Sequence, residues 1–156
     1  MTIASRRGCD RSPVDLGADS ECERLLSYVW PDQAARLARL AAAMAEARKD
    51  PPRLDRADAA AWVRSELPES APTGTTRVLF HSIVWQYLPG PTQQAIAAHM
   101  EQLGAAARGD SPLAWLRYEL SGVESGCELR LTLWPGGDDR VLAAAHAHGN
   151  WIRWNS

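Results

Sequence analysis

Apolar residues at intervals of three and four predict helices in the first half of the chain. Leu37, Leu40 and Met44 recur at this spacing after Pro31, which suits the first turn of a helix because proline lacks an N–H. Asp50-Pro51-Pro52 ends the pattern. The shorter elements expected here are a strand over residues 3–7, a helix from Asp19 or Ser20 that carries Leu25, Leu26 and Val29, a strand over residues 53–57 and a helix over residues 59–67.

The second half changes to patterns typical of strands. Residues 77–82 predict a strand, because they contain a continuous apolar run (Val78-Leu79-Phe80) as in a strand buried on both faces. Thr92 can cap a helix that ends near Gly104 or Gly109. Residues 113–120 and 127–134 flank a short turn and predict an antiparallel hairpin. A short helix over residues 138–145 and a final strand over residues 150–155 complete the expected elements.

Helices that alternate with strands, followed by a hairpin, predict an α/β sandwich with a mixed sheet. We expect residues 1–156 to form a single α/β domain or the C-terminal part of one, with a helical portion (1–67) and a strand-rich half (77–156). The predicted core consists of Leu37, Leu40, Met44, Val78, Phe80, Ile96, Met100, Leu103, Leu116, Leu129, Leu131 and Leu133.

Composition excludes several classes of protein. Seventeen basic and nineteen acidic side chains give a net charge of −2, without the basic excess of a general nucleic-acid-binding protein. No apolar run approaches the length of a membrane span, and Arg6 and Arg7 are not followed by the apolar stretch of a secretory signal. Three cysteines without a close pair predict reduced thiols and no metal site. These features predict a cytoplasmic protein that does not bind membranes.

His81-Ser82 is the first candidate for chemistry, because it stands where a strand ends and a helical turn begins. A serine nucleophile would require a tight G-x-S-x-G turn, which Phe80 and Ile83 do not provide, so a hydrolase is disfavoured. Two interpretations stay open: a capping serine beside a hydrogen-bonded histidine, or a pair that lines a ligand site. Two residues apart on the expected helix, His146 and His148 would point to different sides, which disfavours a metal site.

Acidic and aromatic residues supply the other candidates. Asp58 follows one expected strand and Asp10 another, with Asp15 five residues further on. Each acid can accept hydrogen bonds from a nucleotide's ribose or adenine, or can serve as a helix cap or turn residue. Of the seven tryptophans, Trp85 is the one that we expect to line a pocket, next to Gln86-Tyr87.

Six phrases in register resemble a bacterial family, the proteins with the domain of unknown function 2332. They read GCDRSPVD, LLSYVWPDQAARLARLAAA, DRADAAAWV, LFHSIVWQYLP, PLAWLRYE and ELRLTLWPGGDDRVLAAAHAHGNWIRW. The resemblance implies the C-terminal half of a class I methyltransferase-like fold, a partial doubly wound Rossmann-like sheet, because longer family members carry a Gly-rich S-adenosylmethionine loop in their first half. It further implies Asp10 or Asp15 at the cofactor's ribose, Asp58 and Ala59 near its adenine, and His81, Ser82, Trp85, Gln86 and Tyr87 facing a substrate.

The chain itself contains no such Gly-rich loop. Backbone amides of that loop would hold the charged tail of S-adenosylmethionine, so the resemblance implies a domain that is incomplete as an enzyme alone. The alternative is a non-enzymatic binding or assembly module that completes its sheet with a partner chain or a missing N-terminal half. A small-molecule ligand is the other expected partner.

The strand order of a doubly wound sheet makes this incompleteness specific. The first strand lies between the second and the fourth, in the order 3-2-1-4. By the resemblance, this chain supplies the second, third and fourth strands. We therefore expect unpaired strand edges, and a less well ordered segment before about Pro68 than after Arg77.

Overall fold

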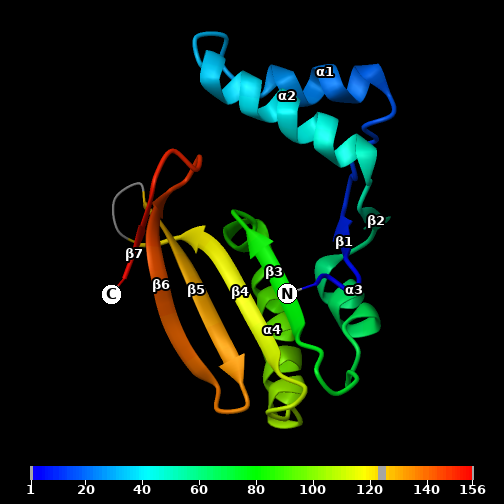
Figure 1. Cartoon of the computed structure of the whole chain (residues 1–156), viewed down its shortest axis with the longest axis vertical. Coiled ribbons are helices and arrows are strands. Elements are labelled where there is room, and N and C mark those ends of the chain that lie inside the picture. Colours follow the sequence, from blue (N-terminus) through cyan, green and yellow to red (C-terminus); the bar gives the residue numbers. More distant parts are fainter. Residues whose placement is uncertain (1, 123–125, 156) are drawn as a thin grey trace. The chain divides into compact units, whose positions relative to one another are not determined.

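The chain folds into two compact units, Met1–Asp58 and Ala59–Ser156. The structure is a computed structural model that describes residues 2–122 and 126–155 (Figure 1). The first unit contains β1 (Arg7–Asp10), α1 (Asp19–Ser27), α2 (Ala34–Lys49) and β2 (Arg53–Arg56). The second contains α3 (Ala59–Glu66), β3 (Arg77–Ser82), the 3-10 turn η1 (Trp85–Tyr87), α4 (Gly90–Ala105), β4 (Leu113–Leu120), β5 (Gly126–Trp134), β6 (Asp138–His146) and β7 (Ile152–Trp154).

In the first unit, two helices connect a pair of parallel strands. β1 and β2 pair from Arg7 with Arg53 to Asp10 with Arg56. The strand predicted over residues 3–7 therefore begins only at Arg7, where the Arg7 Nε donates to Asp55 across the pair at 2.9 Å. Pro31 does not open α2, because Trp30 to Gln33 form a turn in which the Gln33 N–H donates to the Trp30 carbonyl.

The second unit is built on a five-stranded mixed sheet with the order β3-β4-β5-β6-β7. β3 and β4 are parallel and α4 connects them, whereas the other three pairs are antiparallel. The α/β class, the mixed sheet and the hairpin of β4 and β5 confirm the sequence-based expectations. Part of the hairpin's predicted turn, residues 123–125, lies outside the described residues.

The prediction of a helix over residues 138–145 is wrong, because this segment forms strand β6. Its alanines favour a helix locally, but β6 pairs with β5 from Leu133–Asp138 to Gly126–His146. Pairing and burial override a weak local preference, and Ala143 and Ala145 are fully buried in the strand.

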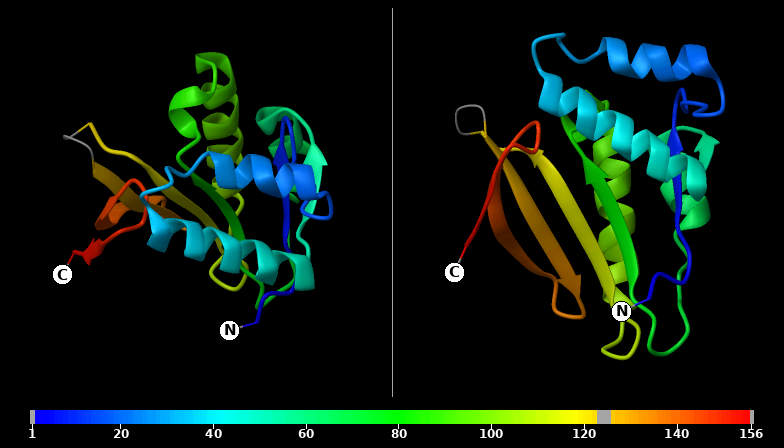
Figure 2. Two further views of the ribbon diagram at one scale, coloured as in Figure 1. Left: turned by 90° about the horizontal axis from the view of Figure 1, so that it is seen from above. Right: turned by 45° about the horizontal axis from the view of Figure 1, so that its top comes forward.

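The core of the second unit lies between the sheet and helices α3 and α4 (Figure 2). Its buried members are Ala60, Ile96, Met100, Leu103, Leu113, Trp115 and Trp134. α4 approaches closely at Gly104, where a Cβ would meet the indole of Trp134 at 2.4 Å. None of the helices described is long and apolar enough to cross a membrane.

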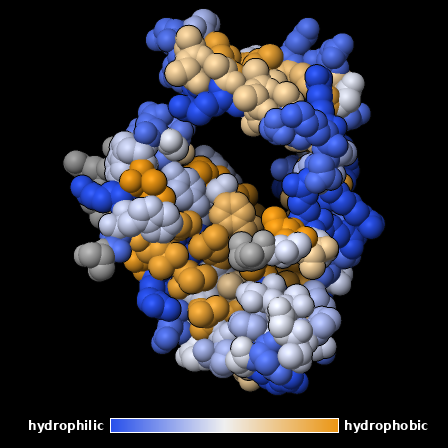
Figure 3. Space-filling view, viewed as in Figure 1, coloured by the Kyte–Doolittle hydropathy of each residue, from blue (hydrophilic) through white to orange (hydrophobic). Residues whose placement is uncertain are grey.

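The opposite face of the sheet is rich in apolar side chains (Figure 3), and on β3 these side chains are exposed, which corrects part of the predicted core. Val78 and Phe80 are 54% and 57% exposed, because β3 is an end strand and only its other face meets α3 and α4. Met44, Ile96, Met100 and Leu103 are buried as predicted. The remaining predicted core residues are half-buried: Leu37, Leu40, Leu116, Leu129, Leu131 and Leu133.

Candidate ligand site at the carboxyl end of β3 and β4

Glu119 organises the carboxyl end of the parallel pair β3 and β4. Its carboxylate binds the Nδ1 atom of His81 at 2.6 Å and accepts the backbone N–H groups of Val84 and Trp85 at 3.1–3.2 Å. The Glu119 side chain is only 15% exposed. A buried carboxylate needs such donors, so Glu119 holds the segment after β3 in a defined conformation.

His81 is neutral in this arrangement, and its tautomer follows from its partners. The indole N–H of Trp115 can only donate, and it points at the His81 Nε2 atom at 3.0 Å. Nε2 is therefore the acceptor, and the ring proton sits on Nδ1, facing Glu119. Burial lowers the pKa of His81 and outweighs the opposing effect of Glu119.

Backbone strain marks the same segment. Ile83 has a φ of +49°, a left-handed conformation that is unfavourable for a β-branched residue. The Ile83 N–H donates to the Tyr118 carbonyl at 2.8 Å, and the chain then turns so that the next two amides reach Glu119. The hydrogen bonds to Glu119 thus offset the local strain, a combination that is frequent at functional sites.

Aromatic rings pack beside this carboxylate. Trp85 stacks on His81 with ring centres 5.1 Å apart and meets Trp115 edge-on at 5.6 Å. The guanidinium of Arg117 lies over the Trp115 ring at 4.5 Å. The segment after β3 is therefore fixed by both hydrogen bonds and ring contacts.

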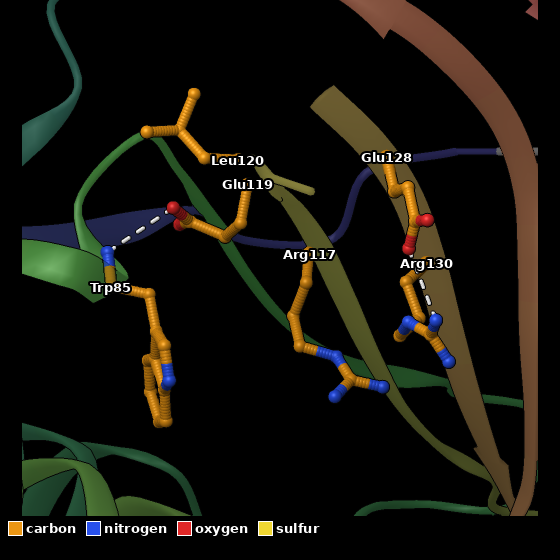
Figure 4. Close-up of a pocket in the computed structure, with 6 residues that line it drawn as sticks. All are labelled: Trp85, Arg117, Glu119, Leu120, Glu128 and Arg130. Carbon is orange, nitrogen blue, oxygen red and sulfur yellow. Dashed lines mark hydrogen bonds and ion pairs between the residues drawn. The ribbon is translucent and has the colours of Figure 1, made fainter. Parts of the chain in front are cut away.

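An open pocket of about 190 Å³ adjoins these groups (Figure 4). It is lined by Trp85, Arg117, Glu119, Leu120, Glu128 and Arg130. Pockets for drug-sized ligands usually enclose about 300 Å³ or more, so this one suits a small polar molecule or one part of a larger ligand.

Ion pairs position the two arginines of the pocket. Asp139 binds both Arg117 and Arg130, and Arg130 also pairs with Glu128 at 3.0 Å. Burial opposes ionisation of Asp139, but its hydrogen bonds with Thr132 and Arg130 keep its pKa below the usual value. The arginines have internal counter-ions, so the pocket offers mixed charge instead of a free anion site.

The structure stacks two of the predicted substrate residues on each other, and the other three are exposed. His81 and Trp85 stack at the pocket, whereas Ser82 lies on the opposite face of β3 and is exposed. Gln86 and Tyr87 belong to η1, and both are exposed. A ligand role for Ser82, Gln86 and Tyr87 stays a prediction.

The predicted cofactor residues belong mainly to the first unit. Asp10 ends β1 and accepts the Ser12 N–H at 2.6 Å, and Asp15 accepts the Gly17 N–H at 2.8 Å. These are turn contacts, the structural alternative considered for both residues. Asp58 ends the first unit, and Ala59 begins α3 of the second. A cofactor role for Asp10, Asp15, Asp58 and Ala59 stays a prediction.

Sequence reasoning missed Glu119, Arg117 and Trp115, which contribute most of the site's contacts. They alternate along β4, and the parallel register pairs His81 with Arg117. One signal could have identified Glu119: it is an acid near the end of β4, the strand that follows the helical connection from β3. Among the described residues, no group of three or more His, Cys, Asp or Glu side chains is arranged to hold a metal ion.

The fold and the site define an α/β protein with a mixed sheet and a polar pocket at the carboxyl end of its parallel strands. The family model described as "Uncharacterized protein conserved in bacteria (DUF2332)" matches residues 1–154, so the chain belongs to this family. No curated protein matches the chain. No solved structure matches it either.

Proposed function

We propose that this chain is a methyltransferase-like domain that is incomplete as an enzyme on its own. The observation that carries the proposal is the occurrence of two helix-connected parallel pairs, β1–β2 and β3–β4, in two separate sheets. A doubly wound sheet without its first strand would leave this pattern, because that strand separates the second from the fourth.

The acids after β1 and β2 would hold the adenosine part of S-adenosylmethionine, whose sulfonium supplies the methyl group in such reactions. Asp10 is the last residue of β1, and Asp58 lies two residues beyond β2. Carboxylates in these places can accept hydrogen bonds from ribose hydroxyls and from an adenine amino group. The chain has no Gly-rich turn to hold the amino-acid tail, so the residues present fit only the adenosine end.

The pocket beside Trp85 and Glu119 would receive the methyl acceptor. Its mixed charge and its aromatic wall suit a small polar acceptor. His81 would act as a positioning residue, because both of its ring nitrogens already have partners.

Ligand titration of the purified chain tests the cofactor part of this proposal. Adenosine and S-adenosylhomocysteine should bind weakly and with similar affinity, because nothing in the chain holds the tail that distinguishes them. At a concentration ten times the dissociation constant, either ligand should add about 1.4 kcal/mol to the stability of the unit that it binds. Calorimetry and thermal unfolding would measure both effects.

Matched variants make the result specific. Asp58→Asn should weaken binding of both ligands, whereas Asp32→Asn, at another exposed acid of the first unit, should not. If neither ligand binds the wild-type chain, or if the two variants bind the ligands equally well, the proposed role of these acids is excluded.

A second candidate function, a binding or assembly module, is favoured by the exposed end strand β3. It requires neither a cofactor nor a methyl acceptor.

A further inference from the structure

Strand β3 presents a row of backbone groups that no strand in the described part of the chain pairs with. The N–H groups of Arg77 and Ile83 donate to carbonyls of Pro112 and Tyr118 on the β4 side. In a parallel ladder alternate residues face the same neighbour, so Val78, Phe80 and Ser82 direct their N–H and C=O groups to the open edge. β3 is the end strand of its sheet.

The exposed side chains of this edge lack the charges and prolines that usually keep end strands apart. Protected edges carry exposed lysines, prolines or bulges, or are covered by a helix or a loop. Here the exposed side chains are Val78, Phe80 and Ser82, all neutral. The charged Arg77 is 7% exposed, and its guanidinium is bound to the carbonyls of Pro68 and Glu69.

We infer that the open edge of β3 pairs with β3 of a second copy of this chain, in antiparallel orientation about a two-fold axis. With Phe80 opposite the partner's Phe80, Val78 lies opposite the partner's Ser82. All three outward-facing residues of each copy then exchange N–H···O bonds with the other copy. The strand is thus complementary to itself.

The side chains and charges of the edge also fit a second copy of the chain. Residues opposite each other in an antiparallel pair point to the same face, so the two Phe80 side chains lie together. Phe80 pairs with Leu116 and Leu116 with Leu131, so the apolar face shown in Figure 3 becomes continuous across the joint. Since the edge is neutral, two identical copies do not repel each other.

The size of the contact indicates a weak dimer. β3 has six residues. A stable interface usually buries more than about 1,000 Å², which a single short strand pair does not reach. The dimer should therefore form and dissociate reversibly as the protein concentration changes.

Sedimentation equilibrium of the purified chain, from about 1 μM to about 1 mM, tests the inference over the range expected for weak association. The average mass should rise from 17.1 kDa toward that of a dimer, without larger species. A chain that stays monomeric throughout, or that forms an open series of oligomers, overturns the proposal.

Matched variants locate the contact. Phe80→Lys should abolish the rise in mass, whereas Ile152→Lys, at a similarly exposed apolar position on the far end strand β7, should not. Circular dichroism would verify that both variants are folded. A dimer that survives Phe80→Lys, or that Ile152→Lys abolishes, contradicts pairing through β3.

Amide hydrogen exchange gives an independent measurement on the unmodified chain. Protection of Val78, Phe80 and Ser82 should increase with protein concentration, while Leu79 and His81, whose amides face β4, should stay protected throughout. Protection of the outward-facing amides that does not change with concentration would contradict the inference.

Discussion

Phe80 shows that the contribution of an apolar residue to stability depends on whether the tertiary structure buries its side chain. An apolar residue in a continuous apolar run is expected in the core, but Phe80 is 57% exposed. Truncation of a buried aromatic side chain costs about 3–5 kcal/mol, mostly through lost burial and the cavity left behind. Neither loss is large at an exposed position.

Phe80→Ala should therefore lower the free energy of unfolding by less than about 1 kcal/mol in dilute solution. Met100→Ala, at a fully buried position on α4, should lower it by about 2–5 kcal/mol. Urea denaturation at a concentration where the chain is monomeric compares the two variants. A larger loss for Phe80→Ala than for Met100→Ala would place Phe80 in the core.

His81 should make the stability of the chain depend on pH. Its pKa is below the usual 6.5 in the folded state, mainly because of burial, so the unfolded state binds the proton more readily. Stability should be complete well above pH 6.5 and should decrease as the pH falls through 6.5 toward the lower folded-state pKa. Protonation would also place a proton on Nε2, which accepts the Trp115 N–H.

Chemical denaturation between about pH 7.5 and 5.5 measures this dependence, above the range where most carboxylates titrate. His81→Gln removes the titrating group and should flatten the profile, whereas His148→Gln, at an exposed histidine, should not. A wild-type profile that is flat, or that rises toward low pH, would contradict a neutral buried His81.

At the scale of elements, Glu119 couples the segment after β3 to strand β4. Glu119→Gln leaves one oxygen for three donors, so the backbone N–H groups of Val84 and Trp85 lose an acceptor. We expect faster amide exchange at both residues and a loss of about 1–3 kcal/mol in stability.

Glu128→Gln is the control for this substitution. Glu128 lies on β5 at the same pocket, and its carboxylate pairs with the Arg130 side chain at 3.0 Å. Its substitution should leave the exchange of Val84 and Trp85 unchanged. Equal effects of the two substitutions would mean that Glu119 does not hold the segment.

The packing of α4 on the sheet depends on Gly104. A Cβ at this position would lie 2.4–2.5 Å from three atoms of the Trp134 indole, which is buried and has little room to move. Gly104→Ala should therefore cost about 1–3 kcal/mol, although alanine is the better helix former. Gly109→Ala, with no atom near the added Cβ, is the matched control in thermal denaturation. A stabilising Gly104→Ala would show that α4 can shift away from Trp134.

At the scale of the whole molecule, the two units differ in the size of their sheets and in the size of their buried apolar clusters. The first unit's sheet has two strands of four residues each, and its buried apolar side chains are Cys22, Val29 and Met44 among those described. Isolated two-stranded sheets are marginally stable. The second unit has a five-stranded sheet and the larger buried cluster.

Amide exchange in a dilute sample should therefore be faster in β1 and β2 than at Leu79 and His81, whose amides face β4. This extends the expectation that the segment before about Pro68 is the less well ordered part. Strong protection that is equal in both units would contradict it.

The sequence by itself determined most elements. The spacing of apolar and polar residues differs between a helix and a strand, because each conformation turns a different set of side chains toward water. The bounds predicted for β3 and β4 are those observed, and the hairpin of β4 and β5 followed from its alternation and its glycines. His81 and Trp85 were predicted as site residues because strand ends in α/β folds often carry functional residues, and the structure stacks their rings on each other.

Only the tertiary structure decided what each strand packs against. It made residues 138–146 a strand by pairing them with β5, and it left Phe80 exposed by placing β3 at the end of the sheet. It also brought Glu119 to His81 from 38 residues away. These outcomes depend on contacts between segments that are distant in the sequence. The free energies of such contacts exceed local conformational preferences, and the contacts leave no periodic pattern in the sequence.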